Sequence, residues 1–396
     1  MKTIIGSEIA ASLVRCLQFL FFLTVPVGAQ AQFTYVVTNQ TVTITGYTGT
    51  IPGRLDVPNV IDGYPVTGIG RSSFVKCLDL ANITIPNNVT YIGDLAFCRC
   101  ENLTNVTIGT NVANIAERAF VECGKLSSLK IPASVVDIGV LAFAACPSLT
   151  TISVNTNNPV YSSVNGVLFN KNQTTLVAYP SGRSGSYSIP IGVTNIGYSS
   201  FEGCYSLTGI AMPKSITSIE SNAFYYCTHL SSVAIGTNVA TIGYAAFSQC
   251  PSLSSIIIPK SVISIADSAF EFCSSLTDAY FEGFPPRFGD DVFFGDNVAV
   301  YYLPNIAGWP IWINNLRVAP WLPQISDDSR SGTQTNQFGF NIAWVSGQTV
   351  VVEACTNLTN PIWLPVATNT LATGSVYFNE FQWTNYPGRF YRVRSP

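Results

Sequence analysis

The sequence has little charge and a single histidine, and both shortages exclude classes of function. Of its 396 residues only 10% are charged, and the formal net charge is −3. A nucleic-acid partner is not expected, because such binding needs an excess of basic side chains to neutralise phosphates. The one histidine, His229, cannot build a zinc site with two or three histidines. We therefore expect no metal ion or other cofactor.

Motifs of catalysis are also missing. The chain has no G-x-S-x-G elbow, no phosphate-binding loop and no dinucleotide fingerprint after a strand. Asp290, Asp291 and Asp296 share one loop but lack the spacing of an EF-hand, so a solvated loop is the expected reading. No pair of carboxylates marks a site for cleaving glycosidic bonds. These absences predict that the protein is not an enzyme.

Long apolar runs are absent except near the N-terminus, where residues 1–31 have the pattern of a signal peptide. Lys2 and Arg15 precede the apolar residues 16–27, which are too few to cross a bilayer. Ala29 and Ala31 give the small-x-small site of signal peptidase. We expect cleavage after Ala31 and an exported chain that is secreted, periplasmic or held at the cell surface. No membrane span is expected after cleavage.

A repeat of 23 residues dominates what remains. Its anchor is a phenylalanine, with an isoleucine five residues before it, a cysteine three residues after it and a leucine six residues after it. The phenylalanines are Phe74, Phe97, Phe120, Phe143, Phe201, Phe224, Phe247 and Phe270. Eight copies in register indicate a solenoid, because one short unit cannot bury its own apolar face and must stack on its neighbours.

Each unit predicts one short strand and one return segment. The stretch L-T-x-I-x-I alternates apolar and polar residues, which is typical of a strand with one buried face. The stretch G-x-x-A-F-x-x-C is expected to form a helical turn that brings the chain back. The cysteine at each repeat is predicted to be a buried, unpaired thiol, because stacked side chains point in parallel and suit no disulfide. Cys98 and Cys355 lie outside this ladder, and their redox state is left open.

The motif resembles the BspA-like, treponemal-type leucine-rich repeat over residues 65–281. The resemblance implies a leucine-rich repeat solenoid with a parallel β-sheet on one face and short helical turns on the other. It also implies adhesion, the attachment to matrix proteins, other cells or surface glycans. This chain departs from wall-attached members of the family because it shows no wall-sorting motif.

Segments outside the repeat predict the remaining organisation. An insertion at about residues 155–189, between Phe143 and Phe201, has two strand-like runs and predicts a β-hairpin. Residues 32–64 and 282–321 are interpreted as N-terminal and C-terminal caps. Residues 322–337 are interpreted as a linker, and residues 338–396 as a small all-β domain like a sandwich.

Two surfaces are candidates for binding an extracellular protein or glycan. The first is the outward side of the predicted sheet, and the second is the insertion hairpin, since loops on rigid scaffolds often carry recognition. The sheet candidates are Asn105, Thr107, Ser128, Lys130, Thr151, Ser153, Ser232, Ser255, Asp278 and Tyr280, and the hairpin candidates are Tyr161, Tyr179, Arg183 and Tyr187. A solvated sheet without a ligand is the alternative for the first surface. A structural protein that self-associates in an envelope or matrix is the alternative for the whole chain.

Overall fold

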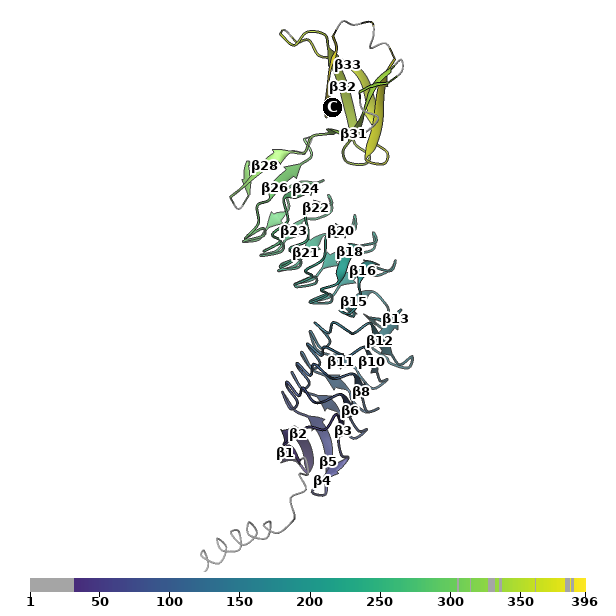
Figure 1. Ribbon diagram of the computed structural model, residues 1–396, viewed down its shortest axis with the longest axis vertical. Coiled ribbons are helices and arrows are strands. Elements are labelled where there is room, and N and C mark those ends of the chain that lie inside the picture. The colour runs from purple at the N-terminus through teal and green to yellow at the C-terminus, as the bar shows by residue number, and fades with distance from the viewer. Residues whose placement is uncertain are drawn as a thin grey trace, which may run out of the picture.

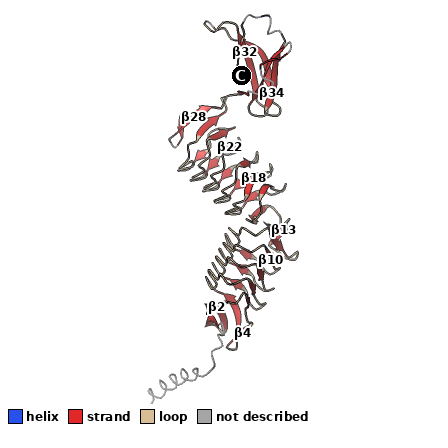
Figure 2. Ribbon diagram, in the orientation of Figure 1, coloured by secondary structure: helices blue, strands red, loops and turns tan. Residues whose placement is uncertain are grey.

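The computed structural model describes residues 32–304, 306–313, 315–326, 332–334, 337–359, 361–381, 385 and 388–396. The predicted signal peptide, residues 1–31, lies outside these residues. Nowhere in the described ranges does a helix reach the length and hydropathy needed to cross a membrane. The chain coils into an elongated stack of rungs that ends in a separate β-domain (Figures 1 and 2).

The stretch L-T-x-I-x-I forms the longer strands, which lie along one edge of the stack. Their alternating burial, as in the exposed and buried residues of β10, places the leucine and isoleucine inside and the polar residues outside. We call the outer side of these strands the sheet face. Its parallel strands are β3 (Arg54–Asp56), β6 (Asn82–Thr84), β8 (Asn105–Thr107), β10 (Ser128–Ile131), β12 (Thr151–Val154), β16 (Gly185–Ser188), β18 (Leu207–Ala211), β20 (Ser232–Ala234), β22 (Ser255–Ile258), β24 (Asp278–Phe281), β26 (Ala299–Tyr302) and β28 (Leu316–Pro320).

Shorter strands around the isoleucine of each repeat make a second edge, in two sheets. The first sheet begins with an antiparallel hairpin and contains β1 (Gln32–Thr38), β2 (Thr41–Thr48), β4 (Val60–Ile61), β5 (Tyr64–Ile69), β7 (Tyr91–Ile92), β9 (Asn114–Ile115) and β11 (Asp137–Ile138). The second contains β13 (Tyr161–Val164), β14 (Val167–Asn170), β15 (Thr175–Ala178), β17 (Asn195–Ile196), β19 (Ser218–Ile219), β21 (Thr241–Ile242), β23 (Ser264–Ile265) and β25 (Arg287–Phe288).

The sequence prediction was wrong about the third edge of each rung, where the expected helical turns are absent from the described residues. The described residues contain no α-helix, and G-x-x-A-F-x-x-C forms consecutive β-turns instead. In the rung of Phe97 the N–H groups of Ala96, Cys98 and Cys100 each donate to the carbonyl three residues earlier. The intervening N–H groups point along the stack, so that Phe97 N donates to Ala119 O of the next rung at 2.8 Å. We call this side the turn face and its inter-rung bonds the turn ladder.

These turns require left-handed backbone two residues before and two residues after each phenylalanine. Leu95 and Arg99 have φ values of 56° and 58°, and most later rungs repeat this with non-glycine residues. Such φ values cost about 1–2 kcal/mol for a residue with a side chain. In the regular rungs the turn ladder offsets that cost, because a left-handed residue there also donates its N–H to the next rung, as Arg99 does to Val121 O at 2.9 Å.

Stacked rings fill the middle of the solenoid. Phe74, Phe97 and Phe120 are fully buried, and their ring centroids lie 5.2 and 5.1 Å apart in nearly parallel planes. Phe224, Phe247 and Phe270 repeat this with spacings of 4.9 and 5.2 Å. The buried residues fall into two clusters, one from Val42 to Leu168 and one from Val167 to Val318. The solenoid therefore has two stacks that meet at the insertion (Figure 1).

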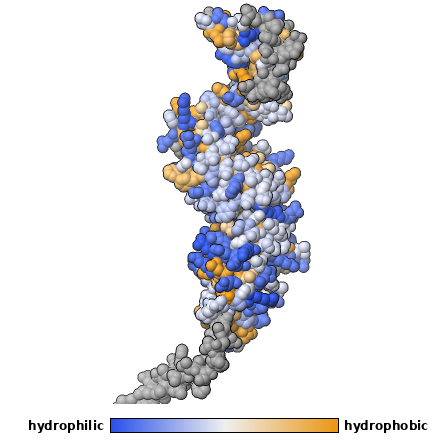
Figure 3. All heavy atoms as spheres, viewed as in Figure 1, coloured by the Kyte–Doolittle hydropathy of each residue, from blue (hydrophilic) through white to orange (hydrophobic). Residues whose placement is uncertain are grey.

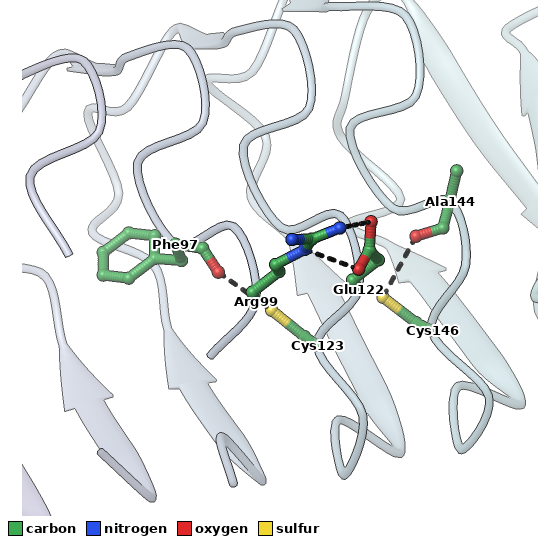
Figure 4. A network of polar contacts seen from close by, with 6 residues as sticks. All are labelled: Phe97, Arg99, Glu122, Cys123, Ala144 and Cys146. Atoms are coloured by element: carbon green, nitrogen blue, oxygen red, sulfur yellow. Dashed lines mark hydrogen bonds and ion pairs between the residues drawn. The ribbon is translucent and has the colours of Figure 1, made fainter. Parts of the chain in front are cut away.

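The ladder cysteines are unpaired thiols, and their burial agrees with the sequence prediction except for the half-buried Cys77. Each buried thiol also donates a hydrogen bond that the prediction did not include. Cys123 Sγ lies 3.2 Å from Phe97 O of the preceding rung, and Figure 4 shows this pair beside the ion pair of Arg99 with Glu122. Burial raises the pKa of Cys227 and Cys250, so these thiols stay protonated and keep their donor. Cys98 and Cys355 are buried and unpaired as well.

The insertion joins the two stacks and is larger than the predicted hairpin. β13, β14 and β15 form an antiparallel meander, and β15 then pairs in parallel with β17 as the first short strand of the second stack. Side chains of the insertion cap the end of the first stack. Fully buried Asn158 donates to Pro132 O and Val135 O at 2.9 and 2.8 Å, and the Tyr161 hydroxyl accepts the N–H of Ile138 at 3.0 Å.

The second stack continues beyond residue 281. β24, β26 and β28 pair in parallel, β27 (Trp312–Ile313) lies antiparallel at the edge, and Phe293 extends the column of rings at 5.5 Å from Phe270. Asp296 then occupies the position that cysteine holds in earlier rungs, three residues after the phenylalanine. Its carboxylate oxygens are buried and have no partner among the described residues, so it is not the solvated residue that the sequence suggested.

The C-terminal β-domain has two antiparallel sheets around its own core, as the sequence predicted. One sheet contains β29 (Gln324–Ser326), β30 (Gly332–Gln334), β31 (Gln337–Ala343) and β34 (Ser375–Glu380), and the other contains β32 (Thr349–Cys355), β33 (Leu364–Thr370) and β35 (Phe390–Arg394). The segment 322–337, interpreted as a linker, thus supplies two of these strands. The domain contacts the last rung through Trp321, whose carbonyl accepts the indole N–H of Trp344 at 3.0 Å.

Candidate functional site

The predicted sheet-face residues all lie on the outer side of the longer strands. Register pairs Ser128 with Thr151 and Lys130 with Ser153 across β10 and β12. Exposed side chains are those of Asn105, Thr107, Ser128, Lys130, Ser232 and Ser255, whereas Thr151, Ser153, Asp278 and Tyr280 are half-buried. Asn105, Thr107 and Lys130 line a shallow depression of about 390 Å³. The visible surface of the solenoid is mostly of intermediate hydropathy, with scattered apolar patches (Figure 3).

The predicted hairpin residues make contacts within the solenoid. Tyr179 is buried, and its ring lies 4.9 Å from Phe201 and 4.8 Å from Tyr187. Arg183 Nε donates to Thr150 O at 2.7 Å, and its guanidinium lies over the Tyr179 ring. Tyr161 uses its hydroxyl to cap Ile138. These side chains help to join the two stacks, and the sheet face and hairpin remain predictions as binding surfaces.

One predicted residue belongs to an aromatic cluster on the sheet face. The rings of Tyr280 and Tyr301 stack across β24 and β26 at 5.1 Å with an angle of 17° between planes, and Trp321 lies 4.5 Å from Tyr280. All three side chains are half-buried and border a depression of about 340 Å³ that Pro320, Leu322 and Gln324 complete. We call Tyr280, Tyr301 and Trp321 the aromatic platform. Sequence reasoning found only Tyr280, because the other two lie in the segment interpreted as a cap.

A second feature lies on the turn face where the two stacks meet. Regular stacking would pair the N–H groups of Leu141, Phe143 and Ala145 with the carbonyls of Tyr198, Ser200 and Glu202. None of the three N–H groups finds a backbone carbonyl within the described part of the chain. Ser200 O instead accepts from Tyr179 N at 2.7 Å, and the Tyr179 ring takes the place of a phenylalanine beneath Phe201. The insertion therefore supplies the ring and the backbone donor at the centre of a rung, but not the backbone groups on either side of that ring.

Two adjoining cavities mark the missing flanks, and we call them together the junction cleft. The inner cavity, of about 220 Å³, lies between residues 138–144 and 197–202, above Thr175, Val177 and Tyr179. The outer cavity, of about 440 Å³, is open to solvent, and its apolar lining residues include Val75, Leu95 and Val121. Its sides carry Lys76, Arg99, Arg118 and Glu122 from the first stack and Glu202, Tyr205, Tyr225 and Tyr226 from the second. Leu141, Ala144 and Glu202 line both cavities.

Polar groups in the junction cleft lack partners. The hydroxyls of Ser199 and Ser200 are buried without a hydrogen bond among the described residues, and the two residues are only 6% and 3% exposed. One oxygen of the Glu202 carboxylate is buried and unpartnered in the same way. Burial also raises the pKa of Glu202, and the neighbouring Ser199 hydroxyl offsets part of this rise. Buried groups of this kind are costly unless water or a ligand satisfies them.

The junction cleft was not predicted from the sequence. Its polar groups come from rungs 58 residues apart, and what distinguishes them is a missing neighbour. The interruption of the 23-residue period was visible, but it could not show which edge of the rung the insertion leaves open. Among the described residues no three His, Cys, Asp or Glu side chains converge as a metal site would require.

Comparison with known proteins identifies the repeat. The sequence matches the family described as "BspA type Leucine rich repeat region" in 6 copies over residues 67–183 and 179–299. The fold is similar to that of the pneumococcal vaccine antigen PcpA, at 17% identity over 74% of this chain and 97% of that one, with a TM-score of 0.54. No curated protein sequence matches the chain.

Two further solved structures share sequence with it. A leucine-rich cell surface protein of Faecalibacterium prausnitzii is 26% identical over 65% of this chain and 89% of that one, with a TM-score of 0.46. The leucine-rich repeat protein TpLRR of T. pallidum is 23% identical over 56% and 87%, with a TM-score of 0.35.

Proposed function

The chain belongs to the family of BspA-type leucine-rich repeat proteins, and from this premise we propose that it is an exported protein that binds a protein or glycan outside the cell. Binding, rather than catalysis, is the activity that its surface supports. The stack presents a rigid sheet face, and the predicted signal peptide would deliver that face to the outside. The observation that carries the proposal is the aromatic platform at the C-terminal end of the sheet face.

Aromatic side chains held by a rigid scaffold often contribute most of the binding energy at a protein interface. They offer large apolar area and lose little conformational entropy on binding. Tyr280 and Tyr301 are fixed by their stacking and by the parallel pairing of β24 with β26. Among the residues that the structure describes, no charged side chain lines the depression beside them. A neutral partner with a flat apolar patch, such as the ring face of a sugar or a proline, fits this chemistry.

The test is binding of residues 32–396 to a glycan array and to a panel of extracellular matrix proteins. Replacing Tyr280 and Tyr301 together by alanine should weaken the affinity for the partner found by about 30-fold, the usual effect of removing a binding hot spot. The matched control replaces Tyr64 and Tyr244, two exposed tyrosines away from the platform, and should leave the affinity unchanged.

Two outcomes contradict the proposal. Binding that is indifferent to the platform variant would remove the platform from the interface. Absence of any glycan or protein partner, together with a mass that grows with concentration in light scattering, would favour the self-associating structural protein instead.

A further inference from the structure

The junction cleft offers hydrogen-bonding groups that every regular rung uses for one purpose. Elsewhere on the turn face the N–H groups at these positions donate to the main-chain carbonyls of the next rung, as Phe120 does to Ala142 at 2.8 Å. At the junction the N–H groups of Leu141 and Phe143 belong to the first stack and the carbonyls of Tyr198 and Glu202 to the second, and none of them has a backbone partner among the described residues. A polypeptide main chain placed between the two stacks could accept hydrogen bonds from these donors and donate to these acceptors.

Buried serine side chains in the junction cleft are further groups that a ligand could satisfy. The Ser200 hydroxyl can donate and accept and has no partner within the described residues, and the Ser199 hydroxyl, which lies near the Glu202 carboxylate, makes no hydrogen bond of 3.5 Å or less to them. The inner cavity, at about 220 Å³, has the volume of about seven water molecules in the liquid. This is enough for a short stretch of main chain, and the outer cavity beside it has room for side chains.

We propose that the junction cleft binds a short extended segment of a partner protein, which pairs through its main chain with the open ends of the turn ladder. This site lies on a different edge of the rung from the aromatic platform and is independent of it. Recognition through the main chain resembles the addition of a strand to an open sheet edge, where backbone bonds give affinity and side-chain pockets give specificity.

The outer cavity defines which segment fits best. Apolar side chains and the rings of Tyr205, Tyr225 and Tyr226 line it, so we expect it to take a large apolar side chain. Arg99 is paired with Glu122 and Arg118 with Glu117, so the charged side chains around this cavity, which include Lys76 and Glu202, have no excess of either sign.

The experiment selects binders to residues 32–396 from a displayed library of short random peptides. Ala144→Tyr should block the cleft, because Ala144 lines both cavities. Its control is Glu271→Tyr, at the same turn position in a regular rung, one residue after Phe270. We expect the selected peptides to lose at least about tenfold in affinity for Ala144→Tyr and to bind Glu271→Tyr as they bind the unmodified chain.

A second pair of measurements separates main-chain recognition from other binding. Replacing Ser199 and Ser200 by alanine removes unpartnered hydroxyls without adding bulk, and should weaken the peptides several-fold. Methylating single backbone nitrogens of the peptide should abolish binding at the positions that face Tyr198 and Glu202. The Tyr280 and Tyr301 variant should bind the peptides normally, which keeps this test apart from that of the proposed function.

The proposal fails if no selected peptide is blocked by Ala144→Tyr, in which case ordered water alone fills the cleft. It also fails if backbone methylation is harmless, since side chains alone would then account for the binding. Blocked binding of glycans but not of peptides would likewise overturn it.

Discussion

A regular rung and the junction rung of this solenoid are built from the same sequence motif but held together differently. Between Phe224 and Phe247 the rings stack at 4.9 Å, the short strands β19 and β21 pair, and Phe224 N donates to Ala246 O at 2.7 Å. Between Phe143 and Phe201 the insertion replaces all three contacts. There Tyr179 supplies the ring, the Tyr161 hydroxyl caps Ile138, and two of the turn-ladder acceptors have no backbone donor in the described part of the chain.

The difference shows what repetition contributes. A regular rung needs no special residue, because its neighbours present the same backbone groups at the same height. An interrupted rung must satisfy those groups with individual side chains, and where none reaches, a cavity with unpaired polar groups is left. Recognition sites are therefore expected where the repeat stops as much as on the repeated faces.

The largest effect should come from the column of phenylalanines. Phe247 has rings on both sides, whereas Phe143 has one stacked neighbour, Phe120, at 6.2 Å. Phe247→Ala should lower the free energy of unfolding by about 3–5 kcal/mol. Phe143→Ala should cost clearly less, and urea denaturation measures both. Equal losses would mean that the junction is packed like any other rung.

Asn158 should be the most sensitive polar residue of the junction. It is fully buried, and its side chain makes four hydrogen bonds, donating to Pro132 O and Val135 O and accepting from Val160 N and Tyr161 N. Asn158→Ala should cost about 3 kcal/mol, because several buried backbone groups lose partners together. The exposed Asn87, which accepts one hydrogen bond from Thr110 N, is the control, and Asn87→Ala should cost less than about 1 kcal/mol. Similar values for the two would remove the capping role of Asn158.

Cysteines at the two kinds of rung should also differ. The Cys227 thiol lies 3.1 Å from Phe201 O, whereas that of Cys204, at the junction, lies 3.9 Å from Tyr179 O. Alanine at position 227 should cost about 1–2 kcal/mol, and alanine at position 204 about 0.5–1 kcal/mol less, because the longer contact contributes little. Thermal unfolding at matched pH measures the difference. A larger loss for the alanine at position 204 would show that packing alone determines how much these thiols contribute to stability.

At the end of the second stack, one rung should differ from the regular rungs in how its stability depends on pH. Asp296 replaces the ladder cysteine of the last ring-bearing rung, and burial raises its pKa to about 7. The folded protein therefore binds a proton that the unfolded chain releases near pH 4, so stability should fall as pH rises from about 4 to 7. Asp296→Cys should remove this fall and raise the stability at pH 8 by about 1 kcal/mol, a fraction of what the full pKa shift would give, because Asp296 is only half-buried and solvent screens its charge. A variant that follows the same pH profile as the unmodified chain would contradict the assignment.

The sequence predicted the regular rungs well, and the junction poorly, for one physical reason. Spacing of Phe, Cys, Leu and Ile determines which side chains face the core, so burial and strand positions could be read directly. One further step of 23 residues from Phe270 would also have found Phe293. The helical turn was wrong because left-handed residues such as Leu95 and Arg99 carry no local signal for that backbone.

The sites show the same division. Tyr280 was found because it stands at an outward strand position, but Tyr301 and Trp321 come from rungs without the repeat signature. The roles of Asn158 and Tyr161 depend on which distant backbone groups the insertion meets. The junction cleft exists because backbone groups lack the neighbours that a regular rung would provide, and no residue in the sequence indicates this.

Hydrogen exchange tests the central claim, the incomplete turn ladder, most directly. The amides of Leu141, Phe143 and Ala145 should exchange with deuterated solvent about a hundredfold or more faster than those of Arg118, Phe120 and Glu122, whose N–H groups pair with the next rung. Equal protection of the two sets would show that the ladder is continuous across the junction, and both the two-stack description and the junction cleft would then be wrong.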